Sequence, residues 1–143
     1  MPKSPASKPE AFAAYQISQT MMFGLRELYR LFDGDITMAI VLGELGQHVS
    51  AYCCSSDCPD QSPQSLRRSN AHSIAAASGI PRETVRRKLE KLIALGWITE
   101  LPNGGVSLNT RLDTPLHLQF LNYNREMLSR MRQTVDILEG IEL

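Results

Sequence analysis

The segment 73–89 constrains the fold more than any other part of the chain. It reads SIAAASGIPRETVRRKL, so an alanine-rich stretch, one glycine and an arginine-rich stretch follow one another directly. Asn70 or Ser69 can cap a helix here by accepting a backbone hydrogen bond, and Gly79 can adopt the positive φ that ends it. Pro81 suits the first position of a second helix, because its missing N–H would be unpaired there. The segment therefore predicts two short helices joined by a tight turn.

The second of these helices has an apolar side and a charged side. Val85, Leu89 and Leu92 recur at intervals of four and three, so they are predicted to face the core. Between positions 67 and 91 the chain carries seven cations and two anions, although its formal net charge is zero. A basic patch on a neutral protein suits a phosphate backbone. A solvated helix face is the alternative, and charge alone does not decide between the two.

Beyond Gly96 the pattern changes from helix to strand. Residues 97–101 alternate in polarity, 102–105 form a turn sequence, and 106–108 return, which predicts a hairpin of two short antiparallel strands. Residues 66–68 are predicted to add a short strand, so the sheet has three strands at most.

Three further helices are predicted around this core. The first, over about 10–32, has an apolar stripe wider than one packing face needs, so it either meets a partner chain or wraps its own core. The second follows Asp33 or Asp35 as a cap and runs over about 36–52, and its Gly43 and Gly46 predict a close approach of another helix. The last begins at Thr114 and Pro115. Its predicted packing seam consists of Leu121, Asn124, Leu128, Met131, Val135 and Leu138.

The predicted fold class is mainly α with a small β-hairpin. We expect a disordered lead over 1–9, an N-terminal helix that acts as a dimerisation arm over 10–34, a central domain over 35–112 and a C-terminal dimerisation helix over 113–143. A long terminal helix with a seam interrupted by polar Asn124 favours a homodimer, because closed two-fold dimers are the commonest oligomers. Packing of the two terminal helices within one chain is the alternative.

Residues 70–108 resemble the winged helix-turn-helix of bacterial transcription regulators of the MarR-like and IclR-like kind. The matching features are Ile74-Ala75, Gly79-Ile80, Thr84-Val85-Arg86, Leu89, Leu92, Gly96-Trp97-Ile98 and the Gly104-Gly105 hairpin. The flanking helices also resemble the dimerising arms of MarR-type proteins. The resemblance implies a DNA-binding transcriptional regulator that acts as a homodimer on double-stranded DNA, with one recognition helix, residues 81–94, from each chain in the major groove.

The resemblance also implies roles for individual side chains. Candidates for reading base edges are Arg82, Glu83, Arg86 and Arg87, because arginine can bond guanine O6 and N7 and glutamate can accept from cytosine N4. Candidates for the DNA backbone are Arg67, Arg68, Asn70, Ser73, Thr84, Lys88, Lys91 and Arg111. The predicted hairpin tip at 102–105 carries no charge, unlike the basic tips common in these families, so base reading rests mainly on the recognition helix.

The cysteines are clustered. Cys53, Cys54 and Cys58 lie within six residues, with His48 before them and His72 after them, and such ligands could bind zinc or respond to redox state. No Cys-x-x-Cys pair is present, and free thiols in a reducing cytosol are the preferred interpretation. No cofactor is predicted, while a small-molecule or redox effector is left open.

Other function classes receive no support from the sequence. No nucleophile elbow, phosphate-binding glycine loop or zinc-protease motif is present, so we expect no enzymatic activity. No run of eighteen apolar residues predicts a membrane span, and the first residues lack the apolar region of a signal peptide, so a cytoplasmic location is expected. The rival hypothesis is a winged-helix module for protein–protein interaction without DNA binding.

Overall fold

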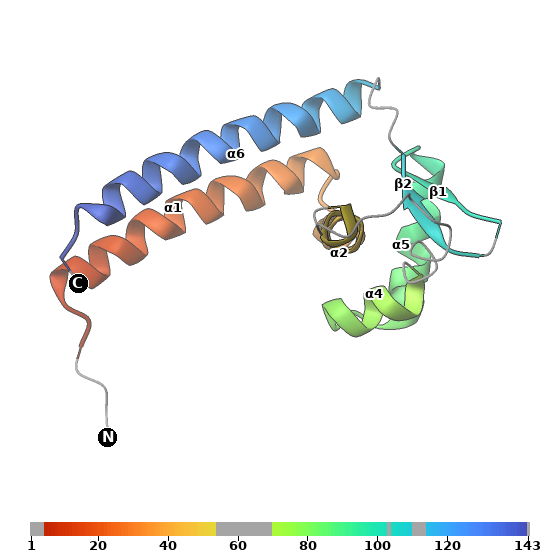
Figure 1. Cartoon of the computed structure of the whole chain (residues 1–143), viewed down its shortest axis with the longest axis horizontal. Helices are drawn as coiled ribbons and strands as arrows, with labels where there is room; N and C mark the ends of the chain where they lie inside the picture. The colour runs from red at the N-terminus through yellow and green to blue at the C-terminus, as the bar shows by residue number, and fades with distance from the viewer. Residues whose placement is uncertain (1–4, 54–69, 103, 110–113, 143) are drawn as a thin grey trace. The chain divides into compact units, whose positions relative to one another are not determined.

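The computed structural model describes residues 5–53, 70–102, 104–109 and 114–142, without the side chains of 49–53 (Figure 1). These residues form five helices and one hairpin of two antiparallel strands, so the prediction of a mainly helical chain with a small hairpin is confirmed. The chain divides into two compact units. The first joins residues 1–33 with 115–143, and the second comprises residues 34–114.

The first unit is a pair of long helices, α1 (Lys8–Leu31) and α6 (Pro115–Glu139). Helix α1 begins inside the predicted disordered lead, because Ser7 caps it. The Ser7 N–H donates to Glu10 Oε2 at 2.6 Å, and the Glu10 N–H donates to Ser7 Oγ at 3.3 Å. Each side chain thereby satisfies a backbone donor of the other, which stabilises the first turn.

Helices α1 and α6 run antiparallel and touch through small and flexible side chains. The hydroxyls of Thr20 and Thr134 lie 2.6 Å apart. A Cβ atom at Gly24 would lie 3.1 Å from Met127 Cε, so the absence of a side chain there lets the helices approach. The predicted approach of another helix at Gly43 and Gly46 is not found among the described residues, since no described atom of another helix lies within 4 Å of a Cβ at either position.

The second unit contains α2 (Ile36–Cys53), α4 (Ala71–Ser78), α5 (Arg82–Ala94) and the hairpin of β1 (Ile98–Glu100) and β2 (Val106–Leu108). Helix α4 ends at Gly79, whose φ of +74° is the left-handed conformation expected from the sequence. Pro81 is the cap of α5 and not its first helical residue, because its ψ of 137° is extended. The hairpin pairs Ile98 with Leu108 and Glu100 with Val106.

Side chains from α2, α4, α5 and the hairpin form the core of the second unit. Its members have at most 9% of their surface exposed and are Met38, Ala39, Val41, Leu42, Leu45, Ile74, Val85, Leu89, Leu92, Trp97, Ile98 and Val106. The strand predicted at 66–68 lies outside the described residues. Among the residues that the structure describes, no helix has the length and hydropathy that crossing a membrane requires.

Candidate nucleic-acid interface

Helix α5 has one buried side and one exposed side, as its sequence predicts. Val85, Leu89 and Leu92 are buried. The four candidate base-reading residues are all exposed, namely Arg82, Glu83, Arg86 and Arg87. The buried side fixes the rotation of α5 about its axis, because turning it would expose three apolar side chains. The arginines are therefore presented outward by the packing beneath them.

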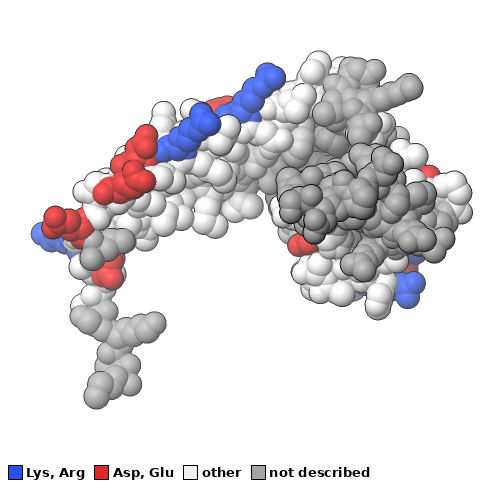
Figure 2. All heavy atoms as spheres, viewed as in Figure 1, with Lys and Arg blue, Asp and Glu red and all other residues white. Residues whose placement is uncertain are grey.

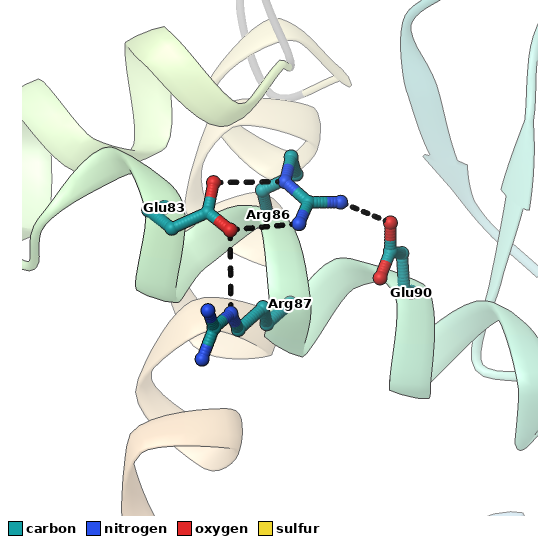
Figure 3. A network of polar contacts seen from close by, with 4 residues as sticks. All are labelled: Glu83, Arg86, Arg87 and Glu90. Atoms are coloured by element: carbon teal, nitrogen blue, oxygen red, sulfur yellow. Dashed lines mark hydrogen bonds and ion pairs between the residues drawn. The ribbon is translucent and has the colours of Figure 1, made fainter.

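The exposed side of α5 carries a network of ion pairs within the helix (Figure 3). Glu83 accepts two hydrogen bonds from Arg86, from Nε at 2.9 Å and from Nη2 at 2.7 Å. The same carboxylate accepts from Arg87 Nε at 3.2 Å, and Glu90 accepts from Arg86 Nη1. Two guanidinium groups thus meet two carboxylates, and the formal charges within the network cancel.

The network alters the protonation equilibria of its members. The hydrogen bond from Arg86 is the main reason that the pKa of Glu83 falls to about 2. The same contact raises the pKa of Arg86 above its ordinary value. Both shifts favour the ionised forms of the two groups. These pairs are solvent-exposed, and exposed pairs contribute little to stability, so the guanidinium groups can exchange partners easily.

Lys88, a candidate for the DNA backbone, points in a different direction. Its ammonium group lies 2.7 Å from Asp35 Oδ2, and the two side chains are only 19% and 22% exposed. Asp35 also caps α2, because its Oδ1 accepts the Met38 N–H at 3.0 Å. Partial burial alone would raise the pKa of Asp35, but the bonds from Lys88 and Met38 outweigh it and lower that pKa. The pair joins the start of α2 to the middle of α5.

The start of α4 engages two further candidates for the DNA backbone. Asn70 Oδ1 accepts the Ser73 N–H at 2.9 Å, and Ser73 Oγ accepts the Asn70 N–H at 3.0 Å. This reciprocal cap anchors the helix that precedes the turn.

Thr84 is half-buried, whereas Arg82 and Lys91 are exposed and form no ion pair within the described part of the chain.

Several predicted site residues cannot be placed. Arg67, Arg68 and Arg111 lie outside the described residues, as do Cys54 and Cys58. His48 is half-buried and His72 is exposed. Within the described ranges no group of three or more histidine, cysteine, aspartate or glutamate side chains could hold a metal ion.

Two acidic residues at this site were not among the predicted site residues. The spacing of Glu90, four residues after Arg86, is the usual helical ion-pair spacing and could have indicated that contact. The sequence holds no such signal for Asp35, which lies 53 residues before Lys88.

Comparisons with known proteins add no relative to this description. No family model, no curated protein and no solved structure matches the chain.

Proposed function

We propose that this protein is a sequence-specific, double-stranded DNA-binding transcriptional regulator that acts as a homodimer, with α5 in the major groove. The observation that carries the proposal is the exposed side of α5, where Arg82, Glu83, Arg86 and Arg87 stand over a buried apolar side. A short helix and a left-handed glycine precede α5 and a two-stranded hairpin follows it. This order is the one expected of a winged helix-turn-helix.

The size of α5 supports the same proposal. Its thirteen residues span about 20 Å, at 1.5 Å per residue, and the major groove, about 12 Å wide, admits one helix. Arginine can bind guanine through two parallel hydrogen bonds. Arg86 already forms two such bonds with Glu83, so binding a guanine would replace a carboxylate by a base of similar acceptor geometry.

The carboxylates give the site a means of discrimination. Glu83 and Glu90 compete with phosphates for Arg86, so loose association with a DNA backbone gains less than it would from free arginines. On a matching site, a base would accept hydrogen bonds from Arg86 and a cytosine would donate one to Glu83. These bonds would replace those that the two side chains form with each other. The acidic residues thus favour specific over non-specific binding.

The structure revises which cations are available to phosphates. Lys88 is bound to Asp35, so we assign it to positioning α5 and not to the DNA backbone. Arg82 and Lys91 remain as exposed cations on α5, and Arg87 retains donors beyond the one bound by Glu83.

One observation favours the rival function. The four charges of the Glu83, Arg86, Arg87 and Glu90 network cancel, so this surface attracts a phosphate backbone less than free arginines would, and its charges could instead complement those of a protein partner. A protein-interaction module would use this surface without DNA. The salt dependence of binding separates the two, because replacing phosphate counterions causes a steep loss of DNA affinity with rising salt.

The test removes two arginines and measures binding to duplex DNA. The probes are a random duplex and the duplex that flanks the chain's own gene. We expect the double variant Arg86→Ala, Arg87→Ala to lose roughly 10- to 100-fold or more in affinity for its preferred duplex, since one good bidentate base contact alone gives about that discrimination. The slope of log affinity against log salt should become shallower by about 0.9 for each phosphate that the variant no longer neutralises.

A matched control removes the same charge from the other unit. The double variant Arg26→Ala, Arg125→Ala takes two exposed arginines from α1 and α6, and we expect it to bind DNA as the parent does. If the α5 variant binds both duplexes with unchanged affinity and salt slope, the proposal is wrong at its centre.

A further inference from the structure

The unit made of α1 and α6 exposes many large apolar side chains. Among the described residues, fifteen large apolar side chains are exposed, and twelve of them lie on these two helices. They are Phe12, Tyr15, Ile17, Met21, Met22, Leu25, Tyr29, Leu118, Leu128, Met131, Val135 and Ile137. The second unit contributes only three, so the exposure is a property of this helix pair and not of the chain as a whole.

The contacts between the helices show which way these side chains point. Thr20 lies against Thr134, and Gly24 lies against Met127, so these residues mark the facing sides of an antiparallel pair. The residue after a contact residue lies about 100° further around its helix. In an antiparallel pair this rotation brings both following residues to the same side, because the two helices face each other and run in opposite directions.

One side of the pair is therefore apolar. Met21 and Leu25 follow the contact residues of α1, and Leu128 and Val135 follow those of α6. Ile17 and Met131 extend the two rows at helical spacing. We call these six residues the apolar face: Ile17, Met21, Leu25, Leu128, Met131 and Val135. Each is between 43% and 59% exposed.

The other side of the pair is polar along its middle. Gln19 precedes a contact residue in α1, and Glu126 and Gln133 precede contact residues in α6. Phe23, a large apolar side chain on this side, lies beneath the guanidinium group of Arg130 at 3.8 Å, whereas Phe12 and Ile137, nearer the end of the pair, are 48% and 41% exposed. Arg130 in turn pairs with Glu126 at 3.2 Å. Along the middle of this side solvent thus meets charged and amide groups, whereas on the opposite side it meets a continuous row of apolar groups.

Charge is also absent from the part of α1 that contributes half of the apolar face. Residues 11–25 contain no lysine, arginine, aspartate or glutamate. Figure 2 shows the same distribution, with charged side chains along the α6 edge and at the end of this unit, and α1 largely white between its ends. A helix that lies on a lipid surface usually carries lysine and arginine on its polar side, so these residues do not suit that role.

The exposed area is large enough for a stable dimer. Tyr15, Met22 and Tyr29 continue the apolar face around α1, which gives nine side chains that are each about half exposed. Half of the roughly 150–250 Å² that a large aromatic side chain can bury is about 100 Å², so nine side chains present at most on the order of 900 Å². A monomer typically tolerates a patch of about 300–600 Å², whereas each partner of a standard interface buries about 800 Å².

We infer that the apolar face binds the same face of a second copy of this chain, so that two α1 and α6 pairs form a four-helix bundle. In a two-fold dimer a residue near the axis contacts the same residue of the second copy, so a charged residue there would meet a like charge. Residues 11–25 carry no charge. Antiparallel pairs with one apolar side are the halves from which such bundles form. The inference rests on the proposed function in one respect only: it names the surface through which the proposed homodimer forms.

The experiment measures the oligomeric state of the full chain without DNA. Sedimentation at about 10 μM, a concentration at which a dimer with a submicromolar Kd is intact, should give twice the monomer mass for the parent chain. Leu25→Glu places a charge in the apolar face, and we expect it to weaken the dimer by roughly 100-fold or more and give a monomer. Leu25→Met should preserve the dimer, since it conserves the apolar contact.

The matched control is Gln133→Glu, which places the same new charge on the polar side of α6 and should remain a dimer. If Leu25→Glu loses its helical circular dichroism signal, the Tm of the parent chain is measured over a range of protein concentrations instead. The Tm of a dimer rises with concentration, whereas the Tm of a monomer does not. A monomeric parent, a dimeric Leu25→Glu variant with native helix content, or a parent Tm independent of concentration overturns the inference. A dimer that binds no DNA would contradict the proposed function and leave this inference standing.

Discussion

The pair of Asp35 and Lys88 joins α2 to the helix that carries the candidate base-reading residues, and its two functions can be separated. Asp35 Oδ2 binds Lys88, whereas Oδ1 caps α2 by accepting from Met38. Asp35→Asn removes the charge but keeps a side chain that caps as well as aspartate does. Asp35→Ala removes the ion pair and the cap together. Comparing the two variants therefore measures each contribution.

The structure sets the expected magnitudes. A hydrogen bond to a charged group contributes about 1.5–3 kcal/mol when buried, and an exposed ion pair contributes about 0–1 kcal/mol. Because both side chains are about one-fifth exposed, Asp35→Asn should lower the free energy of unfolding at pH 7 by about 1–2 kcal/mol. Removal of the cap adds about 1 kcal/mol, so Asp35→Ala should cost about 2–3 kcal/mol.

The assay is urea denaturation, with Lys88→Met completing a double-mutant cycle. The pKa of Asp35 in the folded state lies below its ordinary value of 3.8, so its stabilisation is present above that value and is lost as pH falls through the folded-state pKa. The difference between the parent and Asp35→Asn should therefore vanish in acid. Equal stability of these two proteins at pH 7, or a difference that persists in acid, would refute the reasoning.

Two further predictions concern α5 and the core beneath it. Glu83→Gln should strengthen binding to a random duplex by about 3- to 10-fold at low salt and steepen the salt dependence, because it frees Arg86 and Arg87 for phosphates; band shifts over a salt series measure this, and unchanged affinity would show that Glu83 does not restrain the arginines. Ile74→Ala should lower the free energy of unfolding by about 2–4 kcal/mol, since Ile74 is fully buried in α4; a decrease below about 1 kcal/mol in urea denaturation would show that its site collapses without cost.

Much of the local structure could be predicted because nearby residues determine it. Asn70 caps α4 and Gly79 ends it as the sequence indicates, since capping and positive φ depend on a few adjacent residues. The burial of Val85, Leu89 and Leu92 on α5 follows from helical periodicity. The cap of α1 shows the limit of such patterns, since Ser7 lies in a stretch rich in proline and lysine whose composition indicates disorder.

The candidate site could be predicted only as a set of exposed residues. The sequence places Arg82, Glu83, Arg86 and Arg87 on the outer side of α5, and all four are exposed in the structure. The sequence also indicates Lys88 as a phosphate contact. Residue spacing alone does not show that an acidic residue from α2 lies beside Lys88 and binds it. The charge on a helix can be counted from sequence, but the availability of that charge depends on which partners the fold brings near.

The segment 73–89 by itself determined two short helices, the turn between them and the outward direction of the arginines, because hydrogen bonds and periodicity over a few residues are enough for each. Only the tertiary structure decided that Lys88 pairs with Asp35 and that, among the described residues, close helix approach occurs at Gly24 and not at Gly43 or Gly46. It alone also showed which side of α1 and α6 remains apolar and exposed. These features depend on distances between residues far apart in the chain, and such distances exist only once the helices have packed.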